Sequence, residues 1–360
     1  MPESAPAGPV RADREAGLPR AAGRPLTEAY DVALLDLDGV VYMGGAAVAG
    51  ATAALTEARQ RGMRLAFVTN NASRTPSAIA AQLSRLGVPA DAAEVVTSAQ
   101  AAARLLAERL PAGAPVLVVG GMGLRIAVRE RGLRPVSTAL DRPAAVVQGY
   151  APDIGYPLLA EGGLAVRAGA WFVASNADLT LPTPRGLQPG NGSLVQVIAT
   201  ATGQQPVVAG KPEPPLHAEA VARTGAARPL VVGDRLDTDI EGAVRVGADS
   251  LLVLTGVTRP ADAVLAPEHQ RPSYLADDLS GLLEPHPPVT VAGSEFRCRG
   301  WTARRVTVMA SHDGQASRLE IDGEGAAIDG LRALCAAAWS ADAVAADSVA
   351  SAVARLRFPG

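Results

Sequence analysis

The chain has 360 residues, which is enough for two or three compact domains with separate cores. Apolar residues make up 48% of it and aromatic residues only 3%, a composition typical of an Ala/Val/Leu-packed α/β protein and not of a disordered chain. A formal net charge of −3 gives no electrostatic reason to expect a nucleic-acid partner.

Short β-branched runs alternate with helical stretches from residue 32 to about residue 254, which predicts parallel strands joined by crossover helices. The expected strands are residues 32–35, 65–68, 116–119, 145–147, 171–173, 230–232 and 251–254. The expected helices are residues 77–86, 99–110, 194–202 and 240–246. Polar residues end several of these strands, as expected where loops at the carboxyl edge of a sheet build a site.

A proline cluster at residues 284–288 predicts a linker. Beyond it, residues 289–292, 305–309 and 318–321 are expected to be strands, followed by Ala-rich helical sequence. We therefore expect a small α+β domain over residues 289–360.

The N-terminal sequence, the apolar runs and the number of cysteines indicate the cellular compartment. Cys298 and Cys335 are too few for a disulfide framework, which favours a reducing compartment. No apolar run reaches the roughly 18 residues that a membrane-spanning helix needs, and residues 1–29 lack the apolar core of a signal peptide. We expect a cytoplasmic protein with no membrane partner and with a flexible tail over residues 1–29.

Two carboxylates follow the first expected strand, in Asp36-Leu-Asp38-Gly39. Side chains at positions i and i+2 can both turn into a crevice if the chain leaves the sheet there, and Gly39 permits that departure. Such a pair suits hard-cation binding and covalent catalysis by one carboxylate. The alternative is an ordinary Asp-Gly turn.

Small polar residues end the second strand, in Thr69-Asn70-Asn71. A hydroxyl, a side-chain amide and backbone N–H groups at this point form a neutral cradle for phosphate oxygens. The alternative is that residues 69–73 cap the helix that follows.

Lys211 is the only lysine of the chain, in a sequence that otherwise uses arginine. A compact ammonium on a flexible stem fills a niche that a planar guanidinium cannot fill. The alternative is a surface lysine in a Gly-Pro turn.

Three acidic residues follow a later strand, in Asp234-Arg-Leu-Asp237-Thr-Asp239. Asp237 or Asp239 can cap the next helix, whereas Asp234 is expected at the same sheet edge as Asp36 and Asp38. These carboxylates outnumber the single ammonium of Lys211. A divalent cation resolves the repulsion and draws in phosphate oxygens, and the oxygen-rich ligand set favours Mg²⁺.

Together, the motifs Asp-x-Asp-Gly-Val, Val-Thr-Asn-Asn, Gly-Lys-Pro and Gly-Asp-Arg-Leu-Asp-Thr-Asp resemble those of the haloacid dehalogenase (HAD) superfamily of phosphatases. The sequence is similar to its NagD-like group, subfamily IIA, which includes phosphoglycolate and p-nitrophenyl phosphatases. The match covers about residues 30–283 and implies a Rossmann-like parallel-sheet core over residues 30–97 and 189–283. An inserted α/β cap of C2 type is expected at residues 98–188, where residues 146–155 and 175–182 resemble the family's cap sequences.

The resemblance assigns catalytic roles to the first two motifs. Asp36 is expected to be the nucleophile that forms an aspartyl-phosphate. Asp38 is expected to protonate the leaving alkoxide and then to deprotonate the attacking water. Thr69 and the Asn70 amide are expected to hold the phosphoryl oxygens.

The resemblance also implies how charge is balanced. Lys211 is expected to offset the charge on Asp36 and the transferring group. Mg²⁺ is expected on Asp36, the Asp38 backbone carbonyl and Asp234, with Asp239 orienting these ligands.

The architecture is similar to actinobacterial glycerol 3-phosphate phosphatases with an acetyltransferase-like (GNAT-like) C-terminal domain. We therefore expect a phosphomonoester hydrolase with glycerol 3-phosphate as its small-molecule substrate. Phosphoglycolate or a nucleotide as substrate, a phosphotransferase with the same intermediate, and a non-enzymatic metabolite-binding module are the alternatives. The tail lacks the last small residue of the acetyl-CoA loop, at Thr302, so a structural or regulatory role is expected for it. The sequence is compatible with a homo-oligomer.

Overall fold

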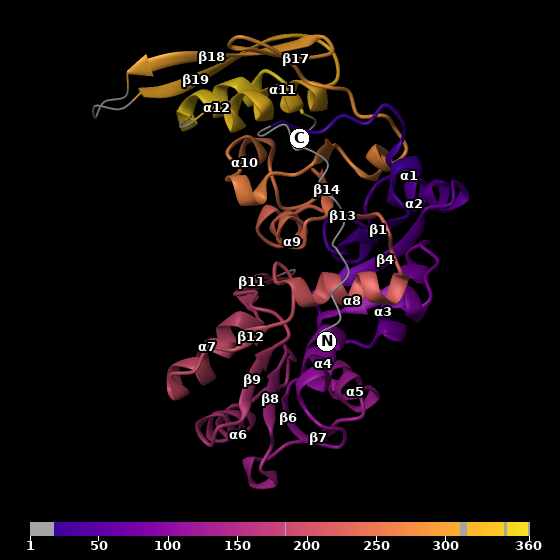
Figure 1. The fold of residues 1–360 in the computed structure, drawn as a ribbon, viewed down its shortest axis with the longest axis vertical. Coiled ribbons are helices and arrows are strands. Elements are labelled where there is room, and N and C mark those ends of the chain that lie inside the picture. Colours follow the sequence, from indigo (N-terminus) through magenta and orange to yellow (C-terminus); the bar gives the residue numbers. More distant parts are fainter. Residues whose placement is uncertain (1–17, 184, 310–314, 342–343, 359–360) are drawn as a thin grey trace, which may run out of the picture.

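A parallel six-stranded sheet forms the core of the protein in the computed structural model, which describes residues 18–358 apart from 184, 310–314 and 342–343 (Figure 1). The strand order is β15-β14-β13-β1-β4-β5. The strands are β1 (Val32–Leu35), β4 (Arg64–Thr69), β5 (Val95–Thr97), β13 (Pro229–Gly233), β14 (Asp249–Val253) and β15 (Tyr274–Ala276). The parallel-sheet core predicted from the sequence is confirmed.

Helices cover both faces of this sheet, which explains why its strands are mostly apolar. Ala33 and Leu35 of β1 pack into one cluster with α2 (Ala51–Gln60) and α3 (Pro76–Arg85). Val32 and Leu34 pack on the opposite face with α4, α8 and α9. These helices are α4 (Ser98–Arg109), α8 (Pro214–Thr224) and α9 (Glu241–Arg245). Among the described helices, none has both the length and the apolarity to cross a bilayer.

A second parallel sheet forms the inserted cap, in the order β12-β9-β8-β6-β7. The strands are β6 (Pro115–Val119), β7 (Arg134–Val136), β8 (Ala145–Gln148), β9 (Trp171–Ala174) and β12 (Val207–Val208). Helices α5 (Met122–Glu130), α6 (Tyr156–Arg167) and α7 (Asn191–Thr202) accompany it, and the hairpin β10 (Thr180–Thr183) and β11 (Gly186–Pro189) precedes α7.

The cap boundary predicted at residue 188 falls inside this unit. Strand β12 pairs with β9, and Val195 and Ile198 of α7 belong to the same hydrophobic cluster as Val146 of β8. The prediction was too short because a strand of two residues has no recognisable pattern.

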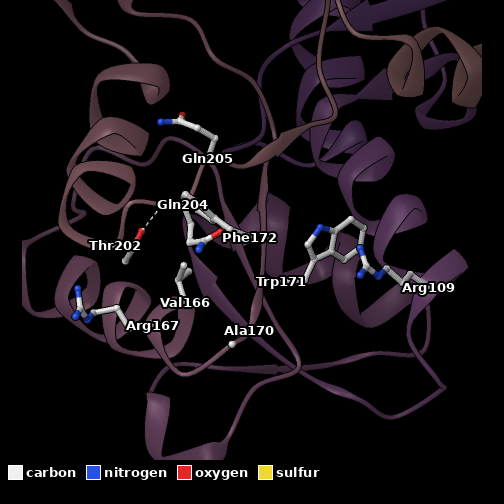
Figure 2. Close-up of a pocket in the computed structure, with 10 residues that line it drawn as sticks. Arg109, Val166, Arg167, Ala170, Trp171, Phe172, Thr202, Gln204 and Gln205 are labelled. Atoms are coloured by element: carbon white, nitrogen blue, oxygen red, sulfur yellow. Dashed lines mark hydrogen bonds between the residues drawn. The ribbon is translucent and has the colours of Figure 1, made fainter.

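A cavity of about 490 Å³ lies at the amino end of β9, remote from the carboxyl edge of the cap sheet (Figure 2). The two arginines that line it already have partners on the protein. Arg109 stacks over Trp171 at 4.5 Å, and Arg167 donates a hydrogen bond to the Ala201 carbonyl at 3.0 Å. Nothing in this cavity indicates a ligand.

The segment before the core is ordered from Leu18 onward, so the predicted flexible tail is wrong for residues 18–29. The Arg20 N–H donates to the Ser273 carbonyl at 2.8 Å, and Leu26 of α1 (Leu26–Ala29) is fully buried. The Ala/Pro/Gly-rich composition of this segment did not predict its order, because the burial of Leu26 depends on tertiary partners. Residues 1–17 lie outside the described residues.

The C-terminal unit is an antiparallel sheet of four strands with two helices. The strands are β16 (Thr290–Ala292), β17 (Glu295–Cys298), β18 (Trp301–Met309) and β19 (Gln315–Gly323), and the helices are α11 (Ala327–Trp339) and α12 (Ala346–Ala354). The α+β character follows the prediction, although the sequence analysis missed β17. Residues 299–300 turn directly into β18, so no helix begins after them to bind a pyrophosphate. The resemblance to acetyltransferases stays a prediction.

The C-terminal unit shares a hydrophobic cluster with the core, and in Figure 1 it lies at the end of the core opposite the cap. Leu331 and Trp339 of α11 join Leu252 and Leu275 of the core sheet in this cluster. Arg332 donates to the Leu275 carbonyl at 2.6 Å. A shared core of this kind predicts that the two units unfold together.

Leu331 tests this coupling because its side chain is fully buried. We expect Leu331→Ala to lower the free energy of unfolding by about 2–5 kcal/mol, the usual effect of emptying a packed leucine site. Urea unfolding followed by tryptophan fluorescence and by loss of catalysis should give coincident transitions. Leu140→Ala, at an 89% exposed position, is the control and should change stability by no more than about 0.5 kcal/mol. Two separate transitions would contradict a shared core.

Candidate active site

Three neighbouring strands of the core sheet deliver the predicted polar residues to one edge. Strand β1 pairs with β13 on one side and β4 on the other. Asp36, Thr69 and Asp234 therefore lie at adjacent carboxyl ends, as parallel strands require. Carboxylate oxygens of Asp36, Asp234 and Asp239 all lie within 4.8 Å of one another.

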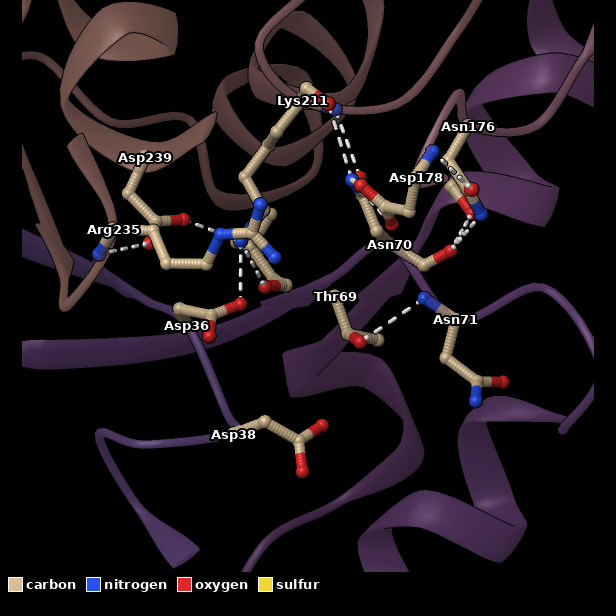
Figure 3. A network of polar contacts seen from close by, with 12 residues as sticks. Asp36, Asp38, Thr69, Asn70, Asn71, Asn176, Asp178, Lys211, Arg235 and Asp239 are labelled. Carbon is tan, nitrogen blue, oxygen red and sulfur yellow. Dashed lines mark hydrogen bonds and ion pairs between the residues drawn. The ribbon is translucent and has the colours of Figure 1, made fainter. Parts of the chain in front are cut away.

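Lys211 inserts its ammonium into this cluster (Figure 3). Its Nζ lies 2.5 Å from Oδ1 of Asp36 and 2.7 Å from Oδ1 of Asp239, and it also donates to the Val68 carbonyl at 3.2 Å. The side chain is only 4% exposed. Burial alone would lower the pKa of Lys211, but the two carboxylates outweigh it and raise the pKa. The lysine is therefore a permanent buried cation and not a surface turn residue.

Asp234 is the part of the cluster that best fits a metal. It is fully buried; its Oδ2 accepts a hydrogen bond from the Val257 N–H at 2.6 Å, whereas its Oδ1 has no partner among the described residues. A Cβ at Gly39 or Gly256 would come within 2.5 or 2.0 Å of Oδ2, so only glycine admits this carboxylate. Burial, followed by the charge of Asp239, raises the pKa of Asp234 to about 6. A buried carboxylate oxygen without a partner, in a cluster with excess negative charge, suits a hard divalent cation.

The two carboxylates of the first motif have different surroundings. Asp36 is 15% exposed, and burial raises its pKa while Lys211 opposes that shift. Asp38 follows on a loop that Gly39 turns with φ +85°, and it accepts a hydrogen bond from the Tyr42 hydroxyl at 3.5 Å. Desolvation by the surrounding protein raises the pKa of Asp38. A carboxyl that retains its proton more readily is suited to protonating a leaving group.

The loop after β4 lies beside the carboxylate cluster, and one of the phosphate donors predicted on it needs a correction. The side-chain amide of Asn70 is occupied by protein: Oδ1 accepts from the Lys211 N–H at 2.8 Å and Nδ2 donates to the Lys211 carbonyl at 3.1 Å. It is therefore not available to phosphate. The Asn70 backbone N–H has no partner in the part of the chain that the structure describes, so that N–H and the Thr69 hydroxyl are the candidate donors.

The alternative for this loop was that residues 69–73 cap the helix that follows. Helix α3 is instead capped by Thr75, whose Oγ1 accepts from the Ala78 N–H at 3.3 Å. Thr69 Oγ1 accepts only a local bond from the Asn71 N–H at 3.1 Å. Thr69 is thus free of a capping role.

The sequence analysis missed four residues beside this site. Ser98, Asn176 and Asp178 contact Asn70, and Arg235 lies next to Asp234. The signal for two of them was available, because Asn176 and Asp178 lie in the polar loop just after β9, as Asp36 and Asp38 lie just after β1.

Comparison with known proteins decides the family. Residues 33–134 match the haloacid dehalogenase-like hydrolases and residues 208–282 match a HAD-hydrolase-like family. The D-glycerol 3-phosphate phosphatase of Mycobacterium tuberculosis is 48% identical over 324 residues, 89% of each chain. The chain belongs to the haloacid dehalogenase-like hydrolases.

Other relatives in this family are phosphatases as well. The 5′-nucleotidase of Bacillus subtilis is 39% identical over 70% of this chain and 96% of its own. A glycerol phosphate phosphatase from Mycobacterium tuberculosis in complex with magnesium has a TM-score of 0.77 and 44% identity, covering 89% of this chain and 94% of that one. The p-nitrophenyl phosphatase of Archaeoglobus fulgidus has a TM-score of 0.65 and 28% identity, over 71% of this chain and 98% of that one. The expected NagD-like subfamily is therefore confirmed.

Lys211→Met tests the charge balance. Without the ammonium, Asp36 and Asp239 would be buried carboxylates with no partner cation, and we expect the metal-free protein at pH 8 to lose about 3–5 kcal/mol of unfolding free energy. Arg245→Met is the control: Arg245 pairs with Glu213 and Glu241 on the surface and should cost no more than about 1 kcal/mol. Equal losses in the two variants would show that the buried cluster is not held by Lys211.

Proposed function

We propose that this phosphatase hydrolyses glycerol 3-phosphate with Mg²⁺ and an aspartyl-phosphate intermediate on Asp36. The observation that carries the proposal is the convergence of Asp36, Asp234 and Asp239 around one buried lysine, beside the donors at the end of β4.

The donor set fits a magnesium ion held by Asp36, the Asp38 carbonyl and Asp234. Asp239 is left to support Lys211 and the loop, since its Oδ1 accepts from the ammonium and its Oδ2 from the Arg235 N–H at 3.2 Å. Bound there, the metal neutralises carboxylates and polarises phosphoryl oxygens.

The chain's own residues account for both half-reactions. A carboxylate oxygen of Asp36 attacks phosphorus, the bond from phosphorus to the substrate oxygen breaks, and Asp38 gives that oxygen its proton. Water then attacks the phosphorus of the aspartyl-phosphate, Asp38 takes a proton from it, and Asp36 leaves with its bonding electrons. The Thr69 hydroxyl and the Asn70 N–H hold the phosphoryl oxygens, and Lys211 keeps Asp36 aligned and charge-compensated.

The choice of substrate rests on how much of this chain each relative matches. The mycobacterial glycerol-phosphate enzyme matches 89% of this chain, whereas the 5′-nucleotidase matches 70%. Glycerol 3-phosphate is therefore favoured over a nucleotide or phosphoglycolate, and hydrolysis over transfer to a second acceptor. A cytoplasmic location, the lack of a nucleic-acid partner, a homo-oligomer and a structural or regulatory C-terminal unit stay predictions of the sequence.

Replacement of the nucleophile tests the reaction. Asp36→Asn should abolish phosphate release, because an amide cannot form the intermediate, while leaving the fold intact by circular dichroism. Release should be measured over a panel of phosphomonoesters that includes glycerol 3-phosphate, phosphoglycolate and nucleoside monophosphates, ranked by kcat/KM. Retained turnover in the variant would defeat the mechanism, and a better substrate in the panel would replace glycerol 3-phosphate.

Removal of the metal gives a second test, with a defined pH dependence. The folded-state pKa of Asp234, about 6, lies above the usual value near 4, so the folded protein binds more protons than the unfolded chain between these pH values. Metal-free protein should therefore lose stability as pH rises from about 4 to about 6. Mg²⁺ must displace those protons, so it should raise Tm more at pH 8 than at pH 5, and EDTA should reverse both this shift and activity. A pH-independent Tm shift would place the metal elsewhere.

A further inference from the structure

Asn70 is the point where the cap is tied to the phosphate cradle. Its backbone carbonyl accepts two hydrogen bonds, one from Ser98 Oγ at 2.6 Å and one from Asn176 Nδ2 at 2.7 Å. Ser98 begins α4, the core helix that leads into the cap, and Asn176 follows the cap strand β9. The peptide that precedes Asn71 is thus held by the start of α4 and by the cap at once.

The side chain of Asn70 extends this connection to a third segment and to one carboxylate. Its amide bonds both the N–H and the carbonyl of Lys211, where the chain returns from the cap to the core. The same Nδ2 donates to Asp178, at 3.2 Å from Oδ2 and 3.4 Å from Oδ1. Figure 3 shows Asp178 and Asn176 next to each other beside Asn70.

Asp178 is itself fixed by the cap backbone. Its N–H donates to Asn176 Oδ1 at 3.2 Å, and its carbonyl accepts from the Gly192 N–H at 2.8 Å. A Cβ at Gly192 would lie 2.2 Å from the Ala177 carbonyl oxygen, so the start of α7 packs directly on this segment. The backbone that carries the carboxylate is thus anchored in the cap, so the carboxylate can position its partner Asn70.

Arg235, on the loop that carries Asp234 and Asp239, pairs with Asp237 at 2.7 Å. Burial raises the pKa of Asp178, and the charge of Arg235 opposes that rise. The charge on this loop therefore acts on the same carboxylate that bonds Asn70.

We propose that Asp178 is a positioning residue for catalysis: through its hydrogen bond to the Asn70 amide it couples the cap to the phosphate cradle. The inference rests on the proposed phosphatase function. When the cap holds Asp178 in place, the Asn70 amide and peptide are fixed against both the cap and Lys211. Without this bond, Asn70 keeps its contacts with Lys211 and the bond from Asn176 to its carbonyl, but its side-chain amide is no longer fixed to the cap.

Variants of Asp178 separate this role from simple structural support. Asp178→Ala removes the acceptor and should lower kcat by roughly 10- to 100-fold, since a misplacement of about 1 Å can cost that much. The inhibition constant of inorganic phosphate should rise in parallel, with Tm in Mg²⁺ unchanged. Asp178→Asn keeps an oxygen that accepts from Asn70 and should remain within about threefold of the wild type in both readouts.

A double variant and a matched control complete the design. Asn70→Ala removes the other partner, so Asp178→Ala should add little loss to it, as expected for residues that act as one unit. Asp153→Ala, which removes an exposed carboxylate of the same cap, should have no effect. If Asp178→Ala does not fold, Asp178→Ser, which is too short to reach Asn70, replaces it with the same expected loss.

The outcomes separate the two proposals. An Asp178→Ala enzyme as active as Asp153→Ala, losses that multiply in the double variant, or an Asp178→Asn enzyme as impaired as Asp178→Ala would each overturn the positioning role. In all of these cases, if the wild type is active and Asp36→Asn abolishes that activity, the proposed phosphatase function is still supported. A wild type that releases no phosphate from the panel would instead remove the proposed function itself.

Discussion

The buried contact of Lys211 with Asp36 and Asp239 is the interaction on which the site depends. Two carboxylates lie at hydrogen-bond distance from one ammonium, in a region that solvent scarcely reaches. Such buried carboxylates are stable only while positive charge compensates them. Asp234 adds a further carboxylate with no partner for one of its oxygens. The protein chain alone therefore leaves the cluster short of positive charge, and a divalent cation is the simplest group that completes it.

Sheet topology explains how much of this site the sequence could predict. Parallel strands place their carboxyl ends at one edge, so polar residues directly after β1, β4 and β13 had to converge once those strands were recognised. Strand β12 and the anchored segment at Leu26 were missed for the opposite reason. Their local sequences carry no period, and only contacts with distant segments, Val173 of β9 for β12 and the core cluster for Leu26, stabilise them.

Asn70 shows a second limit of sequence reasoning. Its position after β4 predicted a place beside the carboxylate cluster, but position does not reveal whether an amide faces a ligand or the protein. The answer lies in partners more than 100 residues away, Asp178 and Lys211, which come to Asn70 only because the cap is inserted between β5 and β13. Side chains that connect domains are therefore the functional residues that a linear sequence hides best.

The C-terminal unit can influence catalysis without reaching the site. Ile240 follows Asp239 directly, is fully buried, and belongs to the hydrophobic cluster that contains Leu331 and Trp301 of the C-terminal unit. Leu236, on the other side of Asp239, packs against the same cluster. The loop that carries an acidic partner of Lys211 is thus anchored at both ends in a core that the C-terminal unit completes. This packing connects the C-terminal unit with the loop of the carboxylate cluster.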